Sequence, residues 1–173
     1  MNKVFGLTVA LLMVASVSSA QLLKPGDMYV GGKIALGAIG GANLGFIANG
    51  EYGLQDDIGV GGVLAYSSYS QDFGLYEYSY TNLMILGSVT YHYDLLKDSK
   101  IDTFGAFNVG LNVGSSTGKW KLASNLPVPS VSHGGLVWGF SANGRYFLTN
   151  KLALTASVGI GLGILNIGID YKL

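Results

Sequence analysis

The sequence predicts an all-β protein folded as a single closed antiparallel barrel of eight strands. Three observations support this prediction. Apolar and polar residues alternate with a period of two along eight segments, all three prolines lie outside those segments, and glycine is abundant, with 27 residues. A β-strand places alternate side chains on opposite faces, and proline interrupts the hydrogen-bond ladder of a sheet.

The alternation is strongest in the last segment, 164–173. Its odd positions from Leu165 onward are apolar or aromatic, whereas its even positions from Asn166 onward are small or polar. A strand with two such different faces would promote aggregation if its edges stayed unpaired. A closed barrel in which this strand pairs with the first one leaves no free edge.

The other seven strands are expected to have similar lengths. We expect them at 28–38, 44–54, 58–69, 81–93, 101–113, 134–148 and 152–162. The predicted connections are turns at 39–43, 55–57, 94–100, 149–151 and near Gly163, and long loops at 70–80 and 114–133. Strands of about ten residues, with short turns at one end and longer loops at the other, are typical of barrels that span a membrane.

The first 20 residues predict a secretory signal peptide. Lys3 is followed by the apolar run Val4–Val17 and then by the small residues Ser18–Ala20. The run is shorter than the roughly 20 residues of a membrane-spanning helix. The barrel domain is therefore expected at 21–173.

The composition excludes several classes of protein. The chain contains no cysteine, so it has no disulfides, no thiol chemistry and no lipid-anchoring cysteine. Charged residues make up 12%, which is about half the usual share of a soluble domain. The formal net charge is zero, and no basic patch indicates a nucleic-acid partner.

The two faces of the predicted strands carry different residues. The polar face is built mostly of glycine, alanine, serine, threonine and asparagine, which suits a narrow lumen better than a surface in water. It also carries a predicted lumen charge cluster: Lys33, Glu51, His92, Asp102, Arg145 and Asp170. The apolar face carries aromatic residues near the strand ends, as expected for the two interfaces of a bilayer: Tyr52, Tyr66, Tyr91, Tyr93, Trp138, Tyr146 and Tyr171.

With these features the chain from Met28 to Leu173 resembles the small eight-stranded bacterial outer-membrane β-barrels of the OmpX, OmpA-transmembrane and OmpW type. The resemblance implies an antiparallel up-and-down transmembrane β-barrel in the outer membrane, surrounded by lipid and lipopolysaccharide. It also implies insertion by the barrel-insertion machinery, a monomer, and no cofactor. Such proteins typically end in an aromatic residue; here Leu173 stands in that place, and Tyr171 supplies an aromatic side chain at the matching outward position.

Three functions of different classes remain open. The leading hypothesis is a non-enzymatic barrel with a structural or surface-interaction role carried by loops 70–80 and 114–133. The alternatives are a small passive porin-like channel, and a soluble periplasmic carrier whose apolar face surrounds a ligand. The lumen charges are expected to neutralise one another and hold the barrel closed; a gate that sets conductance is the other reading.

Catalysis and metal binding are not expected. Some eight-stranded barrels modify lipid A, and that chemistry would require a histidine near a serine or a carboxylate. His92 is predicted at the short-turn end, far from outer-leaflet lipid, and His133 lies beside Ser130 and Ser132 without a recognisable motif. No histidines and carboxylates have the spacing of metal ligands.

Overall fold

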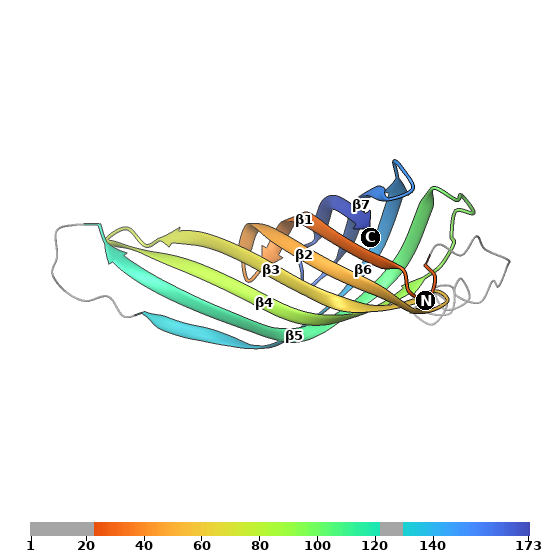
Figure 1. Cartoon of the computed structure of the whole chain (residues 1–173). Helices are drawn as coiled ribbons and strands as arrows, with labels where there is room; N and C mark the ends of the chain where they lie inside the picture. Colours follow the sequence, from red (N-terminus) through yellow and green to blue (C-terminus); the bar gives the residue numbers. More distant parts are fainter. Residues whose placement is uncertain (1–22, 122–129) are drawn as a thin grey trace, which may run out of the picture.

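The computed structural model describes residues 23–121 and 130–173, which form one closed antiparallel barrel. Each strand pairs with the next along the chain, and β8 pairs with β1 to close the ring (Figure 1). The predicted fold class is confirmed, whereas the predicted signal peptide lies outside the described residues. The strands are β1 (Met28–Ile39), β2 (Ala42–Gln55), β3 (Ile58–Asp72), β4 (Tyr76–His92), β5 (Ile101–Trp120), β6 (Val131–Phe147), β7 (Leu152–Ile160) and β8 (Leu165–Lys172).

The outer wall of the barrel is apolar, and its interior is buried. Large apolar side chains such as Ile34, Phe46 and Ile167 point outward and are about half exposed. The alternate positions point inward and include most of the buried polar and charged residues. Within the described part of the chain, no helix is long and apolar enough to cross a membrane.

The described parts of the two predicted long loops are largely strand, so the prediction of loops there is wrong. In the segment 70–80, β3 continues to Asp72 and β4 begins at Tyr76. In the segment 114–133, β5 continues to Trp120 and β6 begins at Val131, and residues 122–129 lie outside the described part. These tyrosine-, serine- and threonine-rich segments pair across strands, as their β-propensity favours.

The extended ends of β3, β4, β5 and β6 form what we call the projecting sheet. It comprises 68–72, 76–82, 114–120 and 131–139. On one side, pairing between β2 and β3 ends at Gly45 and Ser67; on the other, pairing between β6 and β7 ends at Phe140 and Ile160. In Figure 1, β3, β4 and β5 accordingly run well past the ends of β1 and β2.

The two ends of the barrel differ in how far the strands extend. The connection between β4 and β5 is 93–100, which agrees within one residue with the predicted turn at 94–100. The turn between β1 and β2 is only Gly40–Gly41, whose φ values of 61° and 93° suit glycine. Tyr93, which the sequence predicts on the outer wall, directly follows the last residue of β4 and is half-buried.

One half of the lumen contains a cluster of buried apolar side chains in addition to the small and polar lining that we predict. This apolar plug lies nearer the projecting sheet. Leu162 reaches it from the turn 161–164, where the φ values of Gly161 and Gly163 are 94° and 92°. The plug consists of Ala35, Ile39, Ile47, Val63, Ala65, Met84, Leu86 and Leu162.

Candidate functional site

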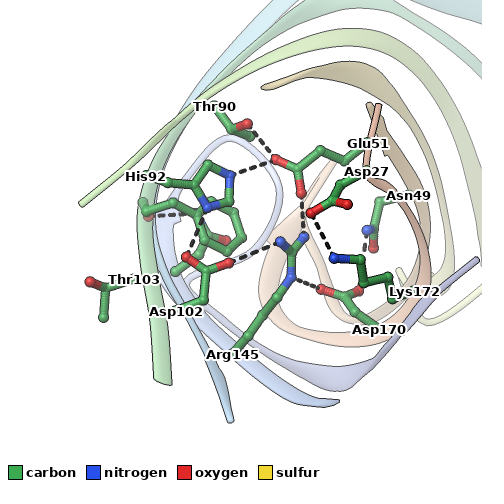
Figure 2. Close-up of polar contacts among 12 residues, drawn as sticks. Asp27, Asn49, Glu51, Thr90, His92, Asp102, Thr103, Arg145, Asp170 and Lys172 are labelled. Atoms are coloured by element: carbon green, nitrogen blue, oxygen red, sulfur yellow. Dashed lines mark hydrogen bonds and ion pairs between the residues drawn. The ribbon is translucent and has the colours of Figure 1, made fainter. Parts of the chain in front are cut away.

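Arg145 is the centre of a charge network in the other half of the lumen. Its side chain points inward from β6 and is 2% exposed. Nε donates to Asp170 Oδ2 at 2.6 Å, Nη1 to Asp102 Oδ2 at 3.2 Å, and Nη2 to Glu51 Oε2 at 2.6 Å (Figure 2). The planar guanidinium group offers several donors in fixed directions, so one cation can bind three carboxylates from three strands.

Two aromatic rings enclose the same guanidinium group. Its Cζ atom lies 4.4 Å from the centre of the Tyr29 ring on β1 and 4.5 Å from that of Phe104 on β5. Cation–π contacts of this kind are stronger where water is excluded. The rings and the ion pairs together leave the guanidinium group almost fully buried.

His92 connects two of the carboxylates. Its Nδ1 lies 2.8 Å from Asp102 Oδ1, and its Nε2 lies 2.9 Å from Glu51 Oε1. A neutral imidazole has one donor and one acceptor, so hydrogen bonds to two carboxylates require one extra proton on the ring or on a carboxyl group. The Thr90 hydroxyl also donates to Glu51 Oε1.

The structure brings together five of the six residues of the predicted lumen charge cluster. The sixth, Lys33, forms no ion pair with any of the described residues and lines a cavity beside the network. Sequence reasoning did not single out Thr90 or Asn49, whose Nδ2 donates to Asp170 Oδ1 at 3.3 Å. Their inward positions were the available signal.

The mouth of the barrel at the turn end is covered by the residues that precede β1. Lys172 Nζ lies 2.6 Å from Asp27 Oδ2, and Leu23 is fully buried. The Gly53 N–H donates to Asp27 O at 2.8 Å, and a Cβ at Gly53 would come within 2.1 Å of Lys24 O. Glycine is therefore required where this lead-in segment crosses β2.

A cavity of about 60 Å³ separates the charge network from the apolar plug. It is lined by polar side chains such as Lys33, Asn108 and Ser157, and by Leu162 of the plug. The Oδ1 atoms of Asn49 and Asn166, which also line it, have no protein partner. A polar cavity of this size can hold a few water molecules, which would satisfy these acceptors.

The outer wall carries the other predicted aromatic residues. Each is between 43% and 59% exposed and points away from the lumen. Aliphatic residues such as Val30, Ile85 and Leu154 lie between the two ends of this wall and are similarly exposed. These outer aromatic residues are Tyr52, Tyr66, Tyr91, Trp138, Tyr146 and Tyr171.

The projecting sheet has an aromatic inner face. Tyr76, Tyr78 and Tyr80 continue the inward alternation of β4, and Tyr69 and Trp120 lie directly across from them on β3 and β5. The ring centres of Tyr69 and Tyr80 are 4.9 Å apart, and those of Tyr76 and Trp120 are 6.0 Å apart. We call these five residues the aromatic ribbon.

The second histidine stands at the base of the projecting sheet and has no catalytic partner there. His133 Nε2 lies 3.3 Å from Asn82 Oδ1, and its ring centre is 6.4 Å from that of Tyr80. Among the described residues, neither Ser130 nor Ser132 forms a hydrogen bond with it. In the same part of the chain, no group of histidines and carboxylates could hold a metal ion.

Solved structures of outer-membrane proteins share this fold. Neisserial surface protein A matches with a TM-score of 0.55 and 13% identity, over 85% of this chain and 95% of that one. Ail, the attachment invasion locus protein of Yersinia pestis, matches with a TM-score of 0.53 and 14% identity, over 85% of this chain and 97% of that one. No protein-family model and no curated protein matches the sequence. The fold is that of the small eight-stranded outer-membrane β-barrels, as the sequence resemblance implies.

Proposed function

We propose that this protein is an integral, non-enzymatic barrel of the bacterial outer membrane that acts through contacts made by its projecting sheet. The observation that carries the proposal is the contrast between the two faces of the barrel wall. The outer wall exposes aliphatic and aromatic side chains all around, whereas the interior buries an arginine and three carboxylates. Such a wall needs lipid around it, and a closed barrel leaves no backbone group unpaired in that lipid.

The same contrast argues against a soluble carrier of an apolar ligand. A carrier of that kind surrounds its ligand with apolar residues and turns polar ones to water. Here the centre of the barrel holds Arg145 with its three carboxylates, and residues such as Leu64 and Ile85 are more than half exposed on the outside. The arrangement is the reverse of a carrier.

The filled lumen argues against a passive channel. The charge network and the apolar plug occupy successive levels, and the cavity between them is only about 60 Å³. An ion would have to break the contacts of Arg145 and then cross an apolar level. The network therefore acts as a structural closure rather than as a gate, and a planar bilayer containing the protein should show no conductance steps.

The expected partners follow from the same placement. Outer-membrane lipid and lipopolysaccharide surround the apolar wall, with the outer aromatic residues at the two membrane interfaces. The barrel-insertion machinery recognises the C-terminal end of the barrel, where Tyr171 on β8 and the following Leu173 are both exposed. The chain reaches the outer membrane through its signal peptide at 1–20 and functions as a monomer.

A surface-interaction role is supported by what is known of the similar folds. Ail is named for attachment and invasion, and one of its structures contains the heparin analogue sucrose octasulfate. That structure matches this chain with a TM-score of 0.51 and 13% identity, over 85% of this chain and 97% of that one. That ligand is polyanionic. The projecting sheet carries Asp72, Glu77 and Lys119, and Lys121 directly follows it. Acidic and basic residues are therefore equal in number there, so a sulfated ligand is not expected.

The proposal is tested by fractionation, gel mobility and conductance. The protein should be recovered in the outer membrane, and in mild detergent it should change gel mobility on boiling, because a closed barrel resists unfolding there. Recovery in the soluble periplasmic fraction without such a shift would overturn the membrane placement. Stepwise conductance with the folded protein would instead favour the channel.

A further inference from the structure

We propose that the aromatic ribbon of the projecting sheet binds a neutral oligosaccharide that approaches from outside the cell. This inference rests on the proposed function, because the ribbon must face the outside. The aromatic ribbon is a line of rings, with centres 5.7 Å apart between Tyr76 and Tyr78 and 6.2 Å apart between Tyr78 and Tyr80. These three side chains are half-buried, so part of each ring remains accessible.

The charges of the projecting sheet are confined to its other face. Glu77 lies across from Asp72 on β3 and from Lys119 on β5, at positions that alternate with the tyrosines. Lys121 Nζ forms an ion pair with Asp72. The inner face therefore carries rings and uncharged polar groups, a combination that selects a neutral ligand over an anionic or cationic one.

Hydrogen-bonding groups stand among the rings. Among the described residues, the buried Nε1 atom of Trp120 has no hydrogen-bond partner. Gln71 lies across from Tyr78, and Ser116 lies across from Tyr80. Gln71 is exposed, so its amide group can exchange hydrogen bonds with the hydroxyl groups of a ligand.

Pyranose sugars combine the two features that this surface requires. Their axial C–H bonds form an apolar face that packs on an aromatic ring, and their hydroxyl groups donate and accept hydrogen bonds. A line of tyrosines along one strand fits successive sugar units better than a single small molecule. An anionic membrane surface would instead require an excess of basic residues, which this sheet does not have.

The inner face is accessible from above rather than from the surrounding membrane. The projecting sheet extends beyond the ends of β1, β2, β7 and β8, so the rim of the barrel is shorter on the side of these four strands (Figure 1). Lipopolysaccharide packed around the barrel would meet the outer face of the sheet, which is rich in serine, threonine and charges. The inner face of the sheet points toward this shorter side of the rim. Its position favours binding of a glycan from outside the cell over binding of the sugars of the surrounding lipopolysaccharide.

The test uses Trp120 as the reporter. Trp120 and Trp138 are the two tryptophans of the chain, so Trp138→Phe leaves Trp120 as the single indole. This variant, in nanodiscs free of lipopolysaccharide, is titrated with maltohexaose, cellohexaose and hexa-N-acetylchitohexaose, and its fluorescence is recorded. We expect a saturable change with at least one of these sugars, and Tyr78→Ala should weaken that binding about tenfold. Glu77→Gln, on the opposite face of the same strand, should leave it unchanged.

Three results would overturn the inference. One is the absence of saturable binding to all three sugars, and another is binding that Tyr78→Ala does not affect. The third is a preference for lipopolysaccharide or for anionic vesicles over the neutral sugars. Each variant is also checked for its gel shift on boiling. A normal shift without sugar binding rejects the glycan site alone. Absence of the shift in the parent protein rejects the proposed function.

Discussion

At the scale of single residues, the stability of the lumen depends on Arg145. Replacing it by methionine would leave Glu51, Asp102 and Asp170 buried without their shared cation. We expect Arg145→Met to lower the free energy of unfolding by about 3–5 kcal/mol. The measurement is denaturant unfolding in detergent micelles, in which the folded fraction is determined from the amount of protein that keeps the gel mobility of the folded form.

The matched control for this prediction is Lys172→Met. Lys172 also pairs with a carboxylate, that of Asp27, but its side chain is 29% exposed at the mouth of the barrel. Its loss should cost about 1 kcal/mol or less. Equal effects of the two substitutions would contradict a central role for Arg145.

The bridge formed by His92 predicts energetic coupling with its neighbours. His92→Phe keeps an aromatic ring against Phe104, from which the imidazole is 4.6 Å away, but removes both contacts to carboxylates. The carboxylates of Glu51 and Asp102 would then repel each other without a proton between them. Adding Asp102→Asn should restore part of the lost stability.

A double-mutant cycle measures this coupling by denaturant unfolding. A non-additive term of about 0.5–3 kcal/mol between positions 92 and 102 is expected for residues in one network. Additive effects would show that His92 is held by stacking alone.

Asp72 predicts a pH dependence at the tip of the projecting sheet. The hydrogen bond from Lys121 holds the pKa of this exposed carboxyl below its usual range. The contact is therefore fully present above about pH 4, the ordinary value for aspartate, and is lost as the pH falls through the lowered pKa. The Gly74 amide donates to Asp72 Oδ1 at 2.8 Å, so its NMR chemical shift should titrate with a midpoint below about pH 4. The shift should not titrate in this way in Asp72→Asn.

At the scale of elements, the strands within the predicted membrane layer could be found from the sequence because their two faces meet different surroundings. β8 is such a case, with Ile167 and Ile169 outside and Asn166 and Asp170 inside. In the projecting sheet both faces meet water, so the apolar alternation fades. The segment 70–80 was predicted as a loop for this reason.

The candidate site could be predicted only in part. Alternation placed Glu51, Asp102 and Arg145 on the inner face. The distances between these side chains depend on the positions of β2, β5 and β6 around the closed barrel. A local sequence pattern does not determine those positions. The apolar plug was missed because Ile39 was assigned to a turn and Leu162 reaches the lumen from one.

The projecting sheet predicts that the barrel folds without the tip of the β3–β4 hairpin. Ser68 and Thr81 are a cross-strand pair, so residues 69–80 can be replaced by a two-residue Asn-Gly turn, which suits a hairpin. The shortened protein should keep its gel shift on boiling, because the network and the plug lie below the cut. It should also lose the sugar-dependent fluorescence change. Failure to fold would show that the tip is needed for assembly of the barrel.

At the scale of the whole molecule, the lumen is closed twice by unlike means. The apolar plug excludes ions by withholding polar partners, and the charge network excludes them by occupying the space with paired groups. The two levels are separated by a small polar cavity. Removing one level should therefore leave the other as a barrier.

This arrangement predicts how conductance responds when the levels are removed in turn. Met84→Ala with Leu162→Ala should open the cavity toward the projecting sheet without giving conductance steps in a planar bilayer, because Arg145 and its carboxylates remain. Conductance should appear only when Arg145→Ala is added together with neutral replacements of all three carboxylates, which avoids leaving unpaired buried charges. Steps from the two-residue plug variant alone would mean that the network is permeable. In that case the plug would be the sole closure, and the network would serve stability only.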